Sequence, residues 1–129
     1  MAGSFADLDP VRHGGSALRG FLNIAREWKL TEEEQRQILG IRESAVFEDL
    51  RIRIQAHEPV PIAEMVIIRI GAVLSIYASL GTQLPPDRMP GWLRSPNQAF
   101  EDRTALSVMT TGKLEDLDRV ARYLLSVRG

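Results

Sequence analysis

The spacing of apolar residues along the chain predicts a series of helices. Between Ala17 and Trp28, apolar side chains recur every three or four residues, as on one face of a helix (Leu18, Phe21, Leu22, Ala25 and Trp28). A second set lies between Ser44 and about Ala56 (Val46, Phe47, Leu50 and Ile54). The segment from about Ile62 to Leu80 is apolar on nearly all sides, which is typical of a helix at the centre of a core.

Capping residues place the ends of the early helices. Thr31 and Glu34 have the spacing of a capping box, which predicts a helix that begins after Thr31. This helix is expected to stop at Gly40, since glycine tolerates the left-handed conformation of a helix end. Ser44 is the expected cap of the next helix, and the segment from His57 to Pro61 breaks it.

The remainder of the chain is predicted to hold three shorter helices. Pro90 suits the first turn of a helix that carries Trp92 and Leu93, and two more helices are expected over about 104–111 and 115–127. In the last helix, one apolar face is expected to be buried (Leu117, Val120, Ala121, Leu124 and Val127). No strand-like alternation of useful length and no internal repeat is visible.

The predicted fold class is therefore all-α, with a helix-turn-helix-like N-terminal unit and a small helical C-terminal domain around a long central helix. Residues 1–16 are polar and glycine-containing, so they are expected to form a flexible lead. Residues 17–58 form the helix-turn-helix-like unit. Residues 59–129 form the central helix and the C-terminal domain, and the interface we expect lies there.

Composition indicates an ordinary soluble domain. The 129 residues are 44% hydrophobic and 26% charged, with no cysteine, which excludes disulfides and thiolate chemistry and suits the cytoplasm. The most apolar run, Ile70 to Leu80, is shorter than the roughly 20 residues that a membrane helix needs. We therefore expect a cytoplasmic protein without a membrane segment.

Charge argues against simple DNA binding. Residues 1–58 hold eight Lys/Arg and ten Asp/Glu, a balance of −2, so the helix-turn-helix-like unit has no positive surplus to neutralise phosphates. Candidate DNA contacts on and before the third helix are Arg42, Ser44, Arg51 and Arg53, but Glu43, Glu48 and Asp49 lie beside them. DNA binding is thus the second hypothesis, and dimerisation would be one way to strengthen it.

The residue inventory favours a binding protein over an enzyme. His13 and His57 belong to no metal-ligand pattern, and neither a glycine-rich phosphate loop nor a serine-nucleophile motif is present. We expect no catalytic residue, no metal and no cofactor.

The C-terminal segment holds structural anchors and a candidate interface. Trp92 has two interpretations, a core anchor or an exposed hot spot, and the core role is favoured. Pro96 and Asn97 are expected to form a fixed bend, and Phe100 a further anchor. The polar side of the last helix is the interface candidate because Arg and Tyr are enriched at hot spots (Arg119, Arg122, Tyr123, Ser126 and Arg128).

At these residues the chain resembles the Xre/MbcA/ParS family of antitoxins, the partners of RES-domain toxins. The resemblance covers roughly Leu18 to Gly129. It rests on the order and spacing of Phe21, Trp28 to Thr31, Leu39 to Ile41, Arg69 to Tyr77, Trp92-Leu93, Pro96-Asn97, Phe100, Leu106, Gly112, Leu117 and Arg122 to Leu124.

The resemblance implies a type II toxin–antitoxin function. RES-domain toxins of this family degrade NAD, and the antitoxin blocks the active-site cleft of the toxin. By similarity, the expected toxin contacts are Arg119, Arg122, Tyr123, Ser126, Arg128 and the terminal carboxylate of Gly129. Family members also commonly repress their own operon as dimers within a larger complex. The alternative is a DNA-binding regulator without a toxin partner.

Two departures from the family pattern are visible. Glu101-Asp102 stands where the family tends to have Gly-Gly, which predicts a different local loop. Glu48-Asp49 stands where basic or neutral residues are usual on the recognition helix, which weighs against operator binding.

Overall fold

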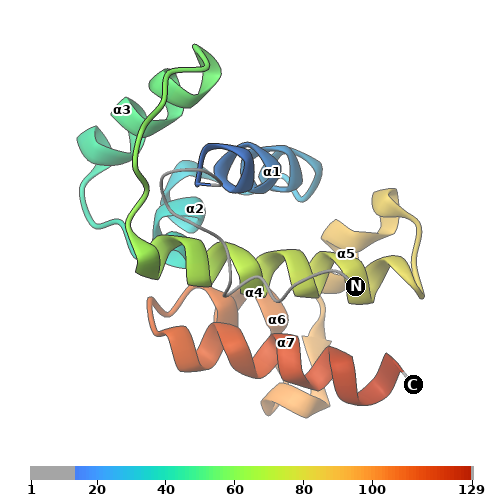
Figure 1. Cartoon of the computed structure of the whole chain (residues 1–129). Helices are drawn as coiled ribbons and strands as arrows, with labels where there is room; N and C mark the ends of the chain where they lie inside the picture. Colours follow the sequence, from blue (N-terminus) through green and yellow to red (C-terminus); the bar gives the residue numbers. More distant parts are fainter. Residues whose placement is uncertain (1–13, 129) are drawn as a thin grey trace.

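The structure, a computed structural model, describes residues 14–128, and helices make up most of them (Figure 1). The elements in chain order are α1 (Gly14–Glu27), α2 (Glu32–Leu39), α3 (Ser44–Gln55), α4 (Glu64–Gly81), η2 (Pro86–Arg88), α5 (Met89–Leu93), β1 (Pro96–Asn97), η3 (Gln98–Phe100), β2 (Arg103–Thr104), α6 (Ala105–Met109) and α7 (Leu114–Arg128). The predicted all-α class is confirmed.

A small antiparallel ladder interrupts the helices. Strands β1 and β2 pair Pro96 with Thr104 and Asn97 with Arg103. Each strand has only two residues, which is too short for the alternation of apolar and polar positions that marks a strand in a sequence. The ladder closes the turn that carries η3.

The capping signals of α2 are confirmed. The Glu34 amide donates to the Thr31 hydroxyl oxygen (3.1 Å), and the Thr31 amide donates to Glu34 Oε1 (2.8 Å). Gly40 ends the helix in the left-handed region with φ 75°. The capping role predicted for Ser44 is wrong, because Glu43 precedes the helix and Ser44 is its first residue. The Ser44 hydroxyl instead donates to Glu32 Oε2, a charged acceptor supplied by α2.

The first helix begins earlier than predicted. It starts at Gly14 rather than Ala17, so residues 14–16 belong to α1 and not to the expected lead. The start of α1 packs closely against the chain before α4, since a Cβ at Gly14 would lie 2.7 Å from Ile62 Cγ1. The rest of the predicted lead lies outside the described residues.

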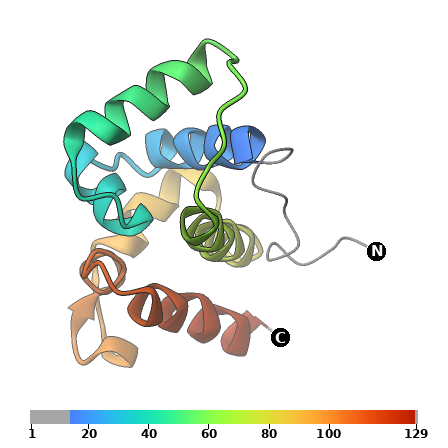
Figure 2. The ribbon, with the colours of Figure 1, turned by 60° about the vertical axis from the view of Figure 1, so that its left-hand side comes forward.

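Helix α4 is the centre of the fold, as predicted. It lies between α1 on one side and α7 on the other, which Figures 1 and 2 show from two directions. Its fully buried side chains include Ile70, Val73 and Ile76. By length and mean hydropathy (18 residues, 1.5) this described helix would also pass as a membrane span. Packing on two helices gives it the position of a core helix, a type that commonly passes the same test.

The buried residues form one continuous cluster. It extends from Phe21 in α1 and Trp28 just after it, through α4, to Phe100 and to Leu117 in α7. Polar contacts also bridge the two halves of the chain: Trp28 Nε1 donates to Met89 Sδ (3.4 Å), and the Tyr77 hydroxyl donates to Glu27 Oε1 (2.8 Å). The N-terminal helices and the C-terminal segment therefore share a core built on α4.

Candidate functional site

The inner face of α7 attaches this helix to α4. Leu117 and Val120 are fully buried, and Ala121 and Leu124 are nearly so. Val127 lies at the equivalent helical position one turn further on, but it is 49% exposed, so its predicted burial is wrong. The helical spacing of this apolar face is as predicted, from Leu117 to Leu124. The difference arises because the side chains that cover the earlier turns of α7 leave its last turn uncovered.

The end of α7 presents apolar surface. Leu125 and Val127 are each 49% exposed, and they are two of five large hydrophobic side chains exposed to this degree among residues 14–127. The sequence reasoning missed Leu125, since it lies outside the apolar face of the helix and carries no charge. The sequence does hold one signal for its exposure: Leu125 is an apolar residue that lies outside the apolar face of the helix, between Leu124 and Ser126.

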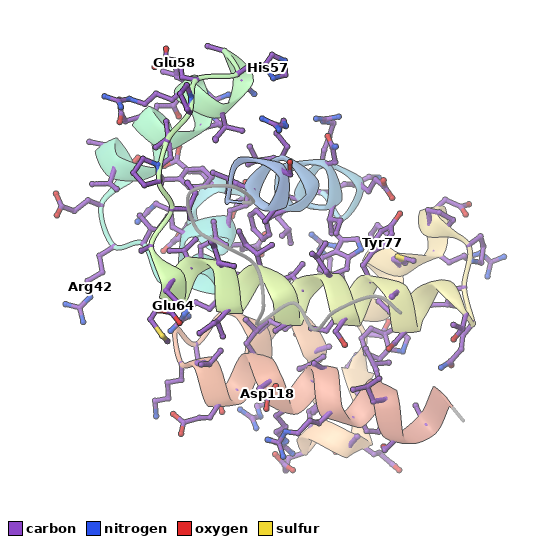
Figure 3. The ribbon with its side chains drawn as sticks, in the orientation of Figure 1. Arg42, His57, Glu58, Glu64, Tyr77 and Asp118 are labelled. Atoms are coloured by element: carbon purple, nitrogen blue, oxygen red, sulfur yellow. The ribbon has the colours of Figure 1, made fainter. Side chains whose placement is uncertain are left out.

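A groove of about 620 Å³ runs between α4 and α7. Small residues form much of its α4 wall, which leaves space between the two helices (Gly71, Ala72 and Ser75). Leu125 lines the groove together with the charged Glu115, Asp118 and Arg122 of α7. Figure 3 shows Asp118 on α7, in the row of side chains that this helix presents outward. The exposed end of α7 and this groove form one surface, which we call the α7 surface.

Arg119 is held inside the domain. Its Nη2 donates to the Ala99 carbonyl (2.9 Å) and to Glu101 Oε2 (2.7 Å). Its Cζ lies 5.4 Å from the centroid of the Phe100 ring, within cation–π range. Tyr123 meets the same ring edge to face at 5.3 Å. These two predicted toxin contacts thus support the turn of residues 98–103.

The other predicted toxin contacts lie further along α7. Arg122 is 67% exposed in its side chain and donates from Nε to Asp118 Oδ2 at 2.9 Å, a pair of the kind that is weak at a surface. The Ser126 hydroxyl is exposed and donates to the Tyr123 carbonyl (2.7 Å). Arg128 belongs to α7, and Gly129 lies outside the described residues.

The turn after η3 uses unusual backbone geometry. Glu101 (φ 55°) and Asp102 (φ 65°) both lie in the left-handed region that glycine favours. Both residues therefore adopt a backbone conformation that glycine would adopt without strain. The Arg119 and Arg103 guanidiniums, which donate to the Glu101 carboxylate, lower its pKa from its ordinary 4.5 to about 2.

The predicted anchors take different positions. Phe100 is fully buried, and Asn97 Oδ1 accepts from the Ala99 amide (2.9 Å), while Pro96 is exposed in β1. Trp92 is only partly buried against the core, and its neighbour Leu93 is fully buried. Trp28, in the turn after α1, has no exposed surface and is the tryptophan buried in the core.

The candidate DNA contacts are mostly paired with acids. Arg51 pairs with Glu48, and Arg53 Nε lies 3.2 Å from Asp49 Oδ2 along the same helix. The Arg42 side chain has no ion pair within residues 14–128, and Figure 3 shows it extending away from the ribbon. The structure thus brings Arg42 and Ser44 to one end of α3. Of the three arginines in this set, Arg42 is the one without an ion pair among the described residues.

The remaining ionisable groups show no catalytic arrangement. His57 is exposed at the end of α3 with φ 59°, and His13 lies outside the described residues. No group of three or more His, Asp or Glu suited to a metal ion occurs within the described part of the chain. What the geometry offers is surface for a partner, above all on α7.

The fold is a small helical one whose terminal helix leaves apolar and charged side chains exposed. Residues 84–129 match the antitoxin Xre/MbcA/ParS C-terminal toxin-binding domain. An uncharacterized protein of Sinorhizobium fredii, y4oB, is 30% identical over 113 residues, which cover 87% of this chain and 84% of that protein. No solved structure matches the chain.

The chain belongs to the Xre/MbcA/ParS antitoxin family, and residues 84–129 are its toxin-binding domain. Antitoxin family membership indicates a regulatory protein with a toxin as its partner. The α7 surface lies mostly inside the matched segment, which also contains the turn braced by Arg119.

Proposed function

We propose that this protein neutralises a RES-domain, NAD-degrading toxin by placing the end of α7 in the active-site cleft of the toxin. The observation that carries the proposal is the exposed apolar end of α7 within the toxin-binding domain. Exposed apolar side chains gathered at one place mark interaction sites in soluble proteins. The complex would form in the cytoplasm, where the substrate NAD is found.

The exposed end of α7 suits insertion into a cleft. Leu125 and Val127 supply apolar area, and Arg122 can exchange its exposed pair with Asp118 for a carboxylate of the toxin. Because the helix is fixed to α4 by Leu117 and Val120, little order is lost when the partner binds. An interface of about 1,600 Å² would be enough for tight inhibition.

Our proposal gives the predicted contacts two different roles. Arg119 and Tyr123 contact Phe100 and the residues around it, so in our proposal they hold the surface in shape. Arg122 and Ser126 remain proposed direct contacts, as do Arg128 and Gly129, and Leu125 and Val127 join them. The steric mechanism is unchanged: the helix occupies the space that NAD would enter.

Coexpression with the neighbouring reading frame tests the function directly. Expressed alone, the neighbour should arrest growth and deplete cellular NAD. Expressed with this protein, it should do neither, and the two proteins should copurify. A harmless neighbour that does not copurify would contradict the antitoxin role.

A pair of matched substitutions tests the surface. Leu125→Ser should weaken toxin binding roughly tenfold or more, about 1.4 kcal/mol, because it removes an apolar contact at the end of α7. Val46→Ser is the control, since Val46 on α3 is similarly exposed (47% against 49%) but lies outside the matched domain. Toxin titration measures binding and thermal melting checks the fold. Equal losses in the two variants would place the interface elsewhere.

A second proposed function is repression of its own operon by a homodimer. The observation in its favour is the connection between α2 and α3: Gly40 turns the chain in the left-handed region, and residues 40–43 give the short link of a helix-turn-helix. Binding to upstream DNA should then fall steeply as salt rises. The same binding by a protein that copurifies with no toxin would instead favour a regulator without a toxin partner.

A further inference from the structure

A polar pocket of about 530 Å³ shares no lining residue with the groove between α4 and α7. It opens between the second half of α2, the turn that follows it, α4 and the loop between α6 and α7. Four cationic side chains line it against one acidic side chain (Arg36, Arg42, Arg69 and Lys113 against Glu33). This local surplus of three positive charges occurs in a protein whose net charge is −1.

Several donors in this pocket are not used. The side chains of Arg42 and Lys113 have no hydrogen bond or ion pair within residues 14–128. Arg36 Nη1 donates to the Arg42 carbonyl (2.7 Å), but its Nε is buried without a hydrogen-bond partner. The closest acid to that Nε, Glu32, has its Oε2 3.5 Å away and also accepts from Ser44. Arg36 Nε is thus ion-paired with Glu32, and the donors left for an acceptor-bearing ligand are those of Arg42 and Lys113.

Arg69 lines the pocket and joins the two halves of the chain. Its Nη2 donates to the Gly112 carbonyl (2.9 Å) and its Nη1 to the Ile38 carbonyl at the end of α2 (3.3 Å). Partial burial lowers the pKa of this guanidinium, which means that its charge lacks solvation. An anion in the pocket would offset that cost.

The start of α7 adds to the positive potential. Gly112 and Lys113 line the pocket immediately before the first residue of this 15-residue helix, whose N-terminal end carries a partial positive charge. Glu115 and Asp116 in the first turn reduce that potential, and Asp116 accepts from the Thr111 hydroxyl (2.7 Å). The four cations still outnumber the acid that lines the pocket.

We propose that this pocket binds a phosphoryl group, with Arg42 and Lys113 as direct ligands and Arg36 and Arg69 as its inner wall. A phosphoryl group offers several acceptor oxygens, and guanidiniums bind it in a forked geometry. The phosphoryl group has two sources, the DNA backbone beside the α2–α3 turn or a free nucleotide. In either case the ligand contacts the N-terminal helices and the toxin-binding domain together. The proposal does not depend on the toxin.

Titration calorimetry at low salt with inorganic pyrophosphate tests the site. The pocket variant is Arg42→Ala with Lys113→Ala. The control is Arg26→Ala with Arg88→Ala, which removes the same charge from exposed positions outside the pocket. We expect saturable binding to the natural protein, at least tenfold weaker binding to the pocket variant, and a change of less than twofold in the control. Absent binding, or equal weakening in both variants, would overturn the proposal.

A competition experiment distinguishes the sources of the phosphoryl group. A duplex of the DNA upstream of the gene is added to the protein saturated with pyrophosphate. Release of pyrophosphate identifies the DNA backbone as the ligand, and retention identifies a free phosphoryl compound. Both outcomes presuppose pyrophosphate binding, which the calorimetry measures without any toxin. Failure of the proposed antitoxin function would therefore not change the pyrophosphate result.

Discussion

Glu101 and Asp102 show how single residues adapt a strained turn. Two successive non-glycine residues in the left-handed region cost about 1–2 kcal/mol each. Glu101 offsets part of this cost by accepting from Arg119 (2.7 Å) and Arg103 (2.9 Å), contacts that a glycine could not make. Arg119 in turn holds the Ala99 carbonyl, so the ion pairs connect the turn to α7.

This arrangement makes part of the stability dependent on pH. Because the folded-state pKa of Glu101 is about 2, below its ordinary 4.5, its contribution is fully present above pH 4.5 and is lost as the pH falls toward 2. Glu101→Gln should therefore lower the melting temperature at pH 7, and the difference from the natural protein should shrink at pH 3. High salt should also shrink it, since the carboxylate is exposed.

Asp102→Asn is the control for this prediction. It neutralises the adjacent carboxylate, which has no ion pair among the described residues, and asparagine tolerates the left-handed region. Its melting temperature at pH 7 should stay close to that of the natural protein. A drop as large as that of Glu101→Gln would mean that net charge, and not the ion pairs, produces the effect.

Gly40 carries a second prediction at the scale of the residue. A Cβ at this position would require alanine at φ 75° and would lie 3.0 Å from Arg69 Cζ. Gly40→Ala should therefore destabilise the protein by about 1–2 kcal/mol in chemical denaturation. Gly91→Ala, which has open space and no positive φ, should be neutral or stabilise by up to about 1 kcal/mol. Similar values for the two variants would contradict the role of the turn.

At the scale of the element, features that depend on nearby residues could be predicted from the sequence, and features that depend on tertiary contacts could not. The periodicity of α1, α3, α4 and α7 and the capping box of α2 were sufficient, because each depends on residues within one or two turns. The periodic apolar positions begin at Ala17, so they do not predict the first turn of α1, where Gly14 packs against Ile62. The sequence pattern favours Ser44 as a cap because its hydrogen-bond partner, Glu32, lies 12 residues away on the preceding helix.

The candidate site likewise has a part that the sequence predicts and a part that depends on tertiary contacts. Its place on the last helix could be predicted from sequence, since Arg122 and Ser126 fall on the polar side. The contacts of Arg119 with Ala99 and Glu101 could not, because they join residues about 20 positions apart through a turn without a sequence signal. The groove between α4 and α7 likewise depends on how two helices pack.

The end of α7 gives the prediction at this scale. Removal of residues 126–129 should weaken toxin neutralisation and leave helical content and melting temperature nearly unchanged. The reason is that the last side chains of α7 whose exposure is described, Ser126 and Val127, are exposed, while the residues that attach the helix end at Leu124. Circular dichroism and a growth-rescue assay measure the two properties. Unaltered rescue would place the interface nearer the groove or on the turn of residues 98–103.

At the scale of the whole molecule, α4 belongs to both predicted units. The division after residue 58 separates α1 and α2 from α4, which both of them contact, and the buried residues form a single cluster. A fragment of residues 59–129 would expose the face of α4 that α1 covers. Independent folding of the two units would therefore leave a large apolar face in water.

The shared core predicts a single cooperative unfolding transition, which the two tryptophans can test. In a Trp28→Phe background, Trp92 alone reports on the C-terminal segment, and circular dichroism reports on all helices. Ile54→Ala then removes a fully buried side chain of α3, at a cost of about 3 kcal/mol, which should lower the melting temperature by roughly 10 °C. Because α3 and the C-terminal segment share one core, Trp92 fluorescence should follow this shift fully and coincide with the dichroism. A Trp92 midpoint that stays unchanged while the dichroism splits into two transitions would show that the toxin-binding domain unfolds independently of the N-terminal helices.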